Sequence, residues 1–146
     1  FQGKADQLGV AKVEKLDEVL RDADYVVICV PLTKETANLI GAGELDLMKP
    51  DAFLVNSSRG GIVDEQALYD CLSKGKIAGA AMDVDVKEPP AADHPLFRLD
   101  NFIGTPHIAG STREAMRRMA VTVAEEVLRV FHGERPKFPV NPQVLD

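Results

Sequence analysis

Apolar runs alternate with amphipathic stretches along the chain, and this alternation predicts strands that alternate with helices. Four apolar runs have strand length and are rich in β-branched or small residues. These runs cover residues 25–30, 53–56, 77–84 and 102–104. Helical spacing of apolar positions predicts helices at residues 13–23, 65–74 and 111–132 and shorter helical turns at residues 33–40, 43–48 and 94–99. We therefore expect an α/β fold with a partial doubly wound, parallel, Rossmann-like sheet.

Capping residues mark the ends of two of these helices. Asp64 is a suitable N-cap for the helix at residues 65–74, and Gly75 stands where a C-cap glycine is expected. Ser111 and Glu114 fit a capping box at the start of the last helix. The sequence thus predicts a defined start for both helices.

The last helix, residues 111–132, is long for a chain of this size. Some twenty residues at about 1.5 Å each span about 30 Å. Its apolar positions predict one buried face, which consists of Ala115, Met116, Met119, Val123, Val127 and Val130. We expect this helix to cross to another domain or subunit. The tail, residues 136–146, carries three prolines and is expected to be extended against a partner surface.

Composition is that of an ordinary globular protein and excludes several functions. The 146 residues are 45% hydrophobic and fit one domain or most of one. A net charge of −6 argues against a nucleic-acid partner, which needs a basic stripe. Without a signal peptide or a long apolar run, we expect a cytoplasmic location and no membrane contact. Cys29 and Cys71 are expected to be buried free thiols, and no paired-cysteine motif indicates a metal site.

A polar turn with two glycines follows the apolar run at residues 53–56. Ser57, Ser58 and Arg59 come directly after this run, and parallel α/β sheets bind ligands just beyond the carboxyl ends of their strands. The glycines that follow let the backbone turn sharply or approach a ligand closely. Arg59 is therefore either a binding residue for a small anion or an ordinary solvated arginine, and the turn alone favours neither.

Four polar residues fall at or just after consecutive strand ends: Arg59, Asp83, Glu88 and His107. Taken alone, Asp83 could cap a turn, Glu88 could be a solvated loop carboxylate and His107 could be a structural histidine. Taken together, they fit the reversible oxidation of an alcohol next to a carboxylate. A histidine takes the alcohol proton, a carboxylate stabilises the charged imidazole, a guanidinium holds the substrate carboxylate, and a nicotinamide ring takes the hydride.

Three stretches, in this order and spacing, carry a resemblance to a known family. They are residues 56–64 (NSSRGGIVD), residues 81–84 (AMDV) with Glu88-Pro89, and residues 105–112 (TPHIAGST). From about residue 15 to residue 141, the chain resembles the D-isomer-specific 2-hydroxyacid dehydrogenases. Residues 30–33 look like the cofactor-side loop of that family. The family usually has an apolar residue after the Asp-Val pair, where this chain has Asp85.

This resemblance implies roles for the candidate residues. Arg59 would bind the carboxylate and carbonyl of the substrate, His107 would be the acid/base, and Glu88 would pair with it. Asp83 would accept a hydrogen bond from the nicotinamide carboxamide. The residues expected to contact NAD or NADP are Val30, Ser57, Ser58, Arg59, Asp83, His107 and Gly110. The substrate would be a small 2-hydroxy or 2-keto acid, which the sequence does not specify further, and the full-length protein would be a homodimer.

Two parts of the family pattern are missing from this sequence, the GxGxxG phosphate turn and the acidic residue that reads the adenosine ribose. We expect residues 1–110 to be the C-terminal part of a dinucleotide-binding domain. Residues 111–146 would be a crossing helix and tail that pack on a separate substrate domain, with no regulatory domain after them. The isolated chain is expected to be inactive and to bind dinucleotide weakly. A dinucleotide-sensing transcriptional corepressor and a plain dimerisation module remain as alternatives.

Overall fold

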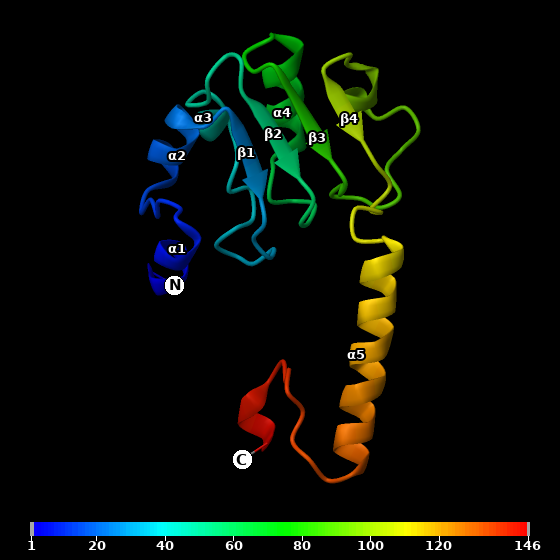
Figure 1. The fold of residues 1–146 in the computed structure, drawn as a ribbon. Coiled ribbons are helices and arrows are strands. Elements are labelled where there is room, and N and C mark those ends of the chain that lie inside the picture. Colours follow the sequence, from blue (N-terminus) through cyan, green and yellow to red (C-terminus); the bar gives the residue numbers. More distant parts are fainter. Residues whose placement is uncertain (1, 146) are drawn as a thin grey trace. The chain divides into compact units, whose positions relative to one another are not determined.

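A parallel four-stranded sheet forms the core of the first of two compact units in the computed structural model, which describes residues 2–145 (Figure 1). The strands are β1 (Tyr25–Ile28), β2 (Phe53–Asn56), β3 (Gly79–Met82) and β4 (Phe102–Gly104), in the spatial order β1-β2-β3-β4. Every neighbouring pair is parallel. The expected Rossmann-like α/β fold is confirmed. Because the order runs in one direction, the described strands correspond to one half of a doubly wound sheet.

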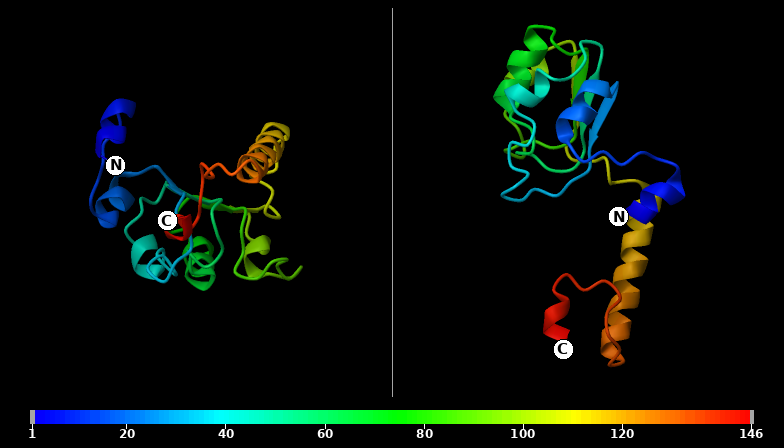
Figure 2. Two further views of the ribbon diagram at one scale, coloured as in Figure 1. Left: turned by 90° about the horizontal axis from the view of Figure 1, so that it is seen from below. Right: turned by 90° about the vertical axis from the view of Figure 1, so that its left-hand side faces the viewer.

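Helices cover one face of this sheet. The helical elements are α1 (Gln2–Leu8), α2 (Leu16–Asp22), α3 (Ala42–Leu45), α4 (Glu65–Ser73), the 3₁₀ turn η1 (Pro95–Arg98), α5 (Arg113–Phe131) and the 3₁₀ turn η2 (Pro142–Leu145). Figure 2 shows α3, α4 and η1 on the same side of the strands. Leu45, Leu68 and Leu96 from these three elements are fully buried and join one core with Leu54 of β2. Burial of each such leucine contributes about 1.5–3 kcal/mol.

β2 and β4 have the bounds of the apolar runs that predict them, whereas β1 and β3 are shorter. β1 ends at Ile28 instead of residue 30, and β3 covers only part of residues 77–84. Residues 34–38 form turns, as predicted, and the Ala37 amide donates to the Thr33 carbonyl at 3.0 Å as in one turn of a helix. Thr36 Oγ1 accepts from the Thr33 amide and donates to the Pro31 carbonyl. Such local side-chain bonds compete with the bonds of a longer helix.

The predicted cap of α4 is confirmed. Asp64 accepts from the amides of Gln66 and Ala67, both at 3.0 Å. Gly75, just past the helix, has the positive φ of 61° expected of a C-terminal glycine. This capped helix follows the turn that carries Arg59.

The predicted capping box of the last helix is wrong by one residue. Thr112 is the N-cap, and its hydroxyl accepts from the Ala115 amide at 3.1 Å. Serine and threonine both suit this position, so the pattern Ser-Thr did not discriminate between them. Glu114 is consequently the second residue of the helix and not the third, which a capping box requires.

The buried face predicted for this helix is not formed within the described residues. Its large apolar side chains are exposed, namely Met116, Met119, Val123, Val127 and Val130. The tail, expected to be extended, contains the η2 turn. The chain divides into two compact units, one up to His107 and one from Ile108 onward. Among residues 2–145, no helix is both long enough and apolar enough to span a bilayer.

Gly60 lies directly against the backbone of the segment that follows β3. A Cβ atom at Gly60 would lie 2.0 Å from the carbonyl oxygen of Asp85. Only a residue without a side chain permits this approach. The turn after β2 and the segment after β3 are therefore packed on each other.

We predict that Gly60→Ala lowers the free energy of unfolding by roughly 1–3 kcal/mol, because two backbone segments must separate. Gly43→Ala is the matched control, since a Cβ at this position in α3 meets nothing within 4 Å. It should stabilise the fold by about 0.5–1 kcal/mol through its higher helix preference. Urea unfolding followed by circular dichroism measures both changes. Equal stability of Gly60→Ala and the native chain would contradict the packing.

Candidate active site

The sheet places three of the predicted residues at one edge. The Asp83 amide donates to the Asn56 carbonyl at 2.9 Å, and the Thr105 amide donates to the Met82 carbonyl at 2.9 Å. The parallel hydrogen-bond ladder thus continues for one residue beyond β3 and β4. Arg59, Asp83 and His107 follow these ends, so the segments that carry them leave the sheet side by side.

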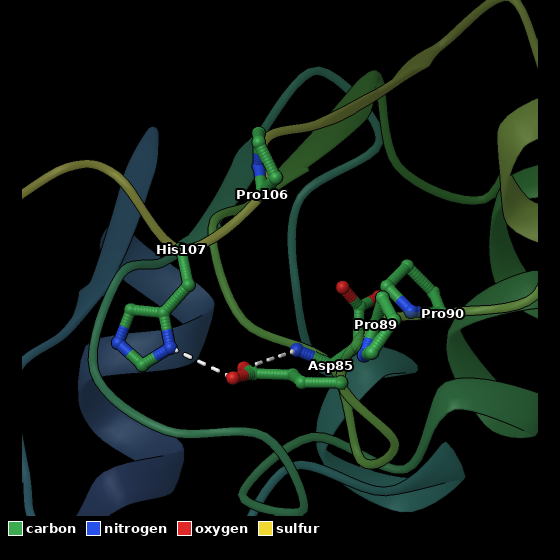
Figure 3. Close-up of a pocket in the computed structure, with 6 residues that line it drawn as sticks. Asp85, Pro89, Pro90, Pro106 and His107 are labelled. Carbon is green, nitrogen blue, oxygen red and sulfur yellow. Dashed lines mark hydrogen bonds and ion pairs between the residues drawn. The ribbon is translucent and has the colours of Figure 1, made fainter.

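His107 and Glu88 form a hydrogen-bonded pair. The Nδ1 of His107 lies 2.8 Å from the Oε2 of Glu88 (Figure 3). The other carboxylate oxygen accepts from the Asp85 amide at 3.2 Å. Both side chains are partly exposed beside a cavity of about 180 Å³, which is lined by Asp85, Glu88, Pro89, Pro90, Pro106 and His107. A carboxylate on Nδ1 orients the ring and leaves Nε2 for a ligand.

The backbone at His107 has an unusual conformation. Its φ is +55°, in the left-handed region that residues other than glycine seldom occupy. Such backbone costs of order 1–3 kcal/mol and is concentrated at functional sites. Here it occurs at the residue that carries the candidate acid/base.

The pKa of the Glu88 carboxyl is lowered by its partners. The hydrogen bond from His107 is the largest cause, followed by the hydrogen bond from the Asp85 amide. The positive charge of Arg59 also lowers this pKa, as the smallest of these causes.

Asn56, the last residue of β2, organises the turn that carries Arg59. Its fully buried side chain donates to the Arg59 carbonyl at 3.0 Å. Its Oδ1 accepts from the Ser58 amide at 3.1 Å and from the Ser58 hydroxyl at 2.8 Å. Sequence reasoning missed this residue, although an asparagine directly before a polar turn is a recognised turn signal.

A second cavity brings several predicted cofactor residues together. It measures about 550 Å³ and is lined by Cys29, Val30, Pro31, Leu32, Ser57, Ser58 and Arg59. Val30, Ser57, Ser58 and Arg59 thus share one surface, as expected from the sequence. Cys29 is exposed, so the prediction of two buried thiols holds for Cys71 alone. Cys29 lies beyond the end of β1, where the sheet no longer covers it.

Asp83 and Gly110 are two further residues predicted to contact the cofactor. Asp83 is only 6% exposed and accepts from the Thr105 hydroxyl at 2.5 Å. Gly110 belongs to the second unit, and its contact with a cofactor stays a prediction.

Asp85 stands where the family usually has an apolar residue, and it is half-buried. Burial and the neighbouring Glu65 raise the pKa of its carboxyl.

The parallel sheet and its strand-end residues define a dinucleotide-binding domain of the Rossmann type. Residues 2–109 match the family described as D-isomer specific 2-hydroxyacid dehydrogenase, NAD binding domain. The chain belongs to this family. A D-3-phosphoglycerate dehydrogenase from Archaeoglobus fulgidus is 46% identical over 138 residues, which are 94% of this chain and 26% of that protein.

Two solved structures resemble the chain closely. The D-lactate dehydrogenase of Lactobacillus jensenii with NAD⁺ has a TM-score of 0.80 and 35% identity, and the match covers 86% of this chain and 42% of that one. A D-isomer specific 2-hydroxyacid dehydrogenase from Xanthobacter autotrophicus Py2, in complex with NADPH and MES, has a TM-score of 0.76 and 36% identity over 88% and 52% of the two chains. The chain therefore spans between about a quarter and a half of these proteins.

We predict that His107→Ala raises the pKa of Glu88 towards the ordinary carboxyl value, as seen by carbon NMR of the carboxyl group. Glu35 is the internal control, because its lowered pKa arises from a hydrogen bond with Thr33 and should stay unchanged. A pKa that is lower in the folded chain stabilises the fold above the ordinary carboxyl pKa, and this contribution is lost as the pH falls through the lowered value. An unchanged Glu88 titration would contradict the pairing.

Proposed function

We propose that this chain is part of an oxidoreductase that transfers a hydride between NAD or NADP and a small D-2-hydroxy acid or 2-keto acid. The observation that carries the proposal is the hydrogen bond between His107 and Glu88, in a chain of this family. The named relatives act as dehydrogenases of phosphoglycerate and lactate. They give no support to the corepressor alternative.

His107 is the proposed acid/base. In the direction of oxidation, its imidazole accepts the proton of the substrate hydroxyl, and in reduction it returns a proton to the carbonyl oxygen. The Glu88 carboxylate holds Nδ1, so that it fixes the orientation of the ring and stabilises the charged imidazolium. When bound, the nicotinamide accepts or supplies the hydride. Positioned proton transfer of this kind contributes about 10²–10⁴-fold in rate.

Arg59 is the proposed anchor of the substrate. A guanidinium presents two parallel donors that match a carboxylate, and it polarises a neighbouring carbonyl. Its Nη1 donates to the Ser58 carbonyl at 2.7 Å, which restrains the exposed side chain. Since Asn56 and Gly60 fix the turn around it, little further ordering is needed on binding.

The residues present fit a dinucleotide. The 550 Å³ cavity offers hydroxyls from Ser57 and Ser58 next to the apolar side chain of Val30, a mixture typical of cofactor sites. Asp83 would accept from the carboxamide of the nicotinamide, and Gly110 is proposed as a further cofactor residue. The structures named above contain NAD⁺ in one case and NADPH in the other, so both cofactors are proposed.

The remaining assignments follow from the same reasoning. Residues 1–110 are proposed as the C-terminal part of a dinucleotide-binding domain, and residues 111–146 as a crossing helix and tail that pack on a substrate domain. That domain would select among glycerate, glyoxylate, hydroxypyruvate, lactate and 3-phosphoglycerate. The protein is proposed to be a cytoplasmic homodimer without a nucleic-acid partner, consistent with its charge of −6.

Replacement of the proposed acid/base should abolish most turnover in the full-length protein. We expect His107→Ala and His107→Asn to lower kcat about 10²–10⁴-fold for reduction of the best 2-keto acid. Asparagine tolerates the positive φ at this position, so its loss of activity reports the chemistry and not the backbone. Arg59→Ala should lower kcat/KM about 10–100-fold through loss of a charge-assisted bond. Arg21→Ala, on α2, is the control, and NADH absorbance measures the rates. Normal rates in the His107 variants would refute the proposal.

The cofactor should protect Cys29 from alkylation in the full-length protein. Cys29 is exposed and lines the 550 Å³ cavity, whereas Cys71 is buried and burial raises its thiol pKa. A maleimide should therefore modify Cys29 first. Saturating NAD⁺ or NADPH should slow this modification and leave the slow rate at Cys71 unchanged. An unaltered rate at Cys29 in an enzyme saturated with cofactor would place the dinucleotide elsewhere.

A further inference from the structure

The segment between β3 and η1 carries Glu88 but contains no helix or strand. Residues 83–94 form bends and turns, with Pro89 and Pro90 at their centre. A proline has no amide hydrogen to donate, so these positions cannot join a ladder. The Asp85 amide bonds Glu88 from within the segment, and contacts from outside are needed to hold the segment itself in place.

Glu65, the first residue of α4, supplies two such contacts. Its Oε1 accepts from the Val86 amide at 2.7 Å, and its Oε2 lies 3.5 Å from the Nε2 of His94. The side chains of Glu65 and His94 are 19% and 21% exposed, much less than those of Glu88 and His107. Glu65 thus holds the segment near both of its ends.

The turn after β2 makes a further contact with the segment that carries Glu88. Gly60 touches the carbonyl of Asp85, as described above, and the Asp85 amide donates to Glu88. Asp85 and Val86 are therefore held between the Arg59 turn and α4. The Asp85 amide donates to Glu88 and the adjacent Val86 amide donates to Glu65. These two amides therefore connect Glu65 to the pair formed by Glu88 and His107.

We propose that Glu65 is a positioning residue that holds the segment carrying Glu88, so that Glu88 remains in place for His107. The effect of Glu65 on catalysis rests on the proposed function, whereas its effect on the position of the segment rests on the contacts alone. A carboxylate suits this task because it bonds an amide more strongly than a neutral acceptor does. It is also favoured at the positive end of a helix.

The base of this contact is rigid. Asp64 caps α4 next to Glu65, and the fully buried Leu68 anchors the same turn of the helix in the core. The negative charge of Glu65 is felt in the segment, since it raises the pKa of Asp85. The neighbouring Gln66 offers a contrast, because its side-chain amide donates to Asp70 within the same helix.

Four variants of the full-length protein test this role. Glu65→Ala removes both contacts, and Glu65→Asp keeps the charge at the helix start but shortens its reach. Glu65→Gln keeps an oxygen that can accept from Val86 and is the conservative rescue. Gln66→Ala is the matched control on the same turn of α4. Should Glu65→Ala fail to fold, Glu65→Asp carries the same test.

Two measurements need no enzymatic activity. In Glu65→Ala, hydrogen exchange at the Val86 amide should accelerate about 10–100-fold, the range of a hydrogen bond to a charged acceptor. The pKa of Glu88 should rise towards its ordinary value as the segment moves away from His107. Glu65→Asp should shift both in the same direction, Glu65→Gln should give values between those of Glu65→Ala and the native protein, and Gln66→Ala should leave both near the native values. An unchanged exchange rate and an unchanged Glu88 pKa in Glu65→Ala overturn the proposal.

The kinetic measurement tests the catalytic meaning. In Glu65→Ala, kcat should fall about 10–100-fold, because a small misplacement of a catalytic group has effects of this size. KM for the keto acid should change less than about threefold, since Arg59 is not displaced. Glu65→Gln should recover most of kcat. An equal fall in Gln66→Ala overturns the assignment to Glu65. Absence of hydride transfer by the native protein would instead refute the proposed function, and the exchange and pKa results would still decide the role of Glu65.

Discussion

The parallel register of the four strands is the constraint on which the candidate site depends. Asn56 pairs with Met82, and Met82 pairs with Gly104, so the last residues of three strands lie in one row. The segments that follow must therefore leave the sheet together. A slip of one residue would turn every side chain of a strand to the opposite face. The meeting of residues from distant parts of the sequence is thus a property of the sheet rather than of any single loop.

Beyond this row, side chains replace the partners that the ladder no longer supplies. Asn56 bonds the backbone of the Arg59 turn, Glu88 accepts from the Asp85 amide, and Glu65 accepts from the Val86 amide. Backbone polar groups near a core must be satisfied in some way, and irregular segments depend on side chains for this. The same carboxylate of Glu88 that satisfies an amide also orients His107. One carboxylate therefore both holds the backbone and serves the proposed chemistry.

Local patterns in the sequence were sufficient to predict the sheet and its strand-end residues. Apolar runs identified all four described strands, and the turn residues placed Arg59 at the edge. β1 and β3 were predicted too long, because hydrophobicity does not report where hydrogen bonding stops. Glu65 was missed for a related reason. A glutamate in the first turn of a helix is explained by the helix dipole alone, and its contacts with Val86 and His94, more than twenty residues away, leave no local signal.

The prediction of burial failed for apolar side chains that the described residues leave exposed. Val27 and Ile103 are 57% and 66% exposed, although the runs that contain them are typical of strands covered on both faces. The register places them in one row with Val55 and Ala81, so the open face of the sheet is a continuous apolar surface. The apolar side chains of α5 are exposed in the same way. Under the proposed assignment, these surfaces are where the rest of the enzyme would pack. An apolar pattern therefore specifies which side chains require cover, while the covering segment can lie anywhere in the assembled protein.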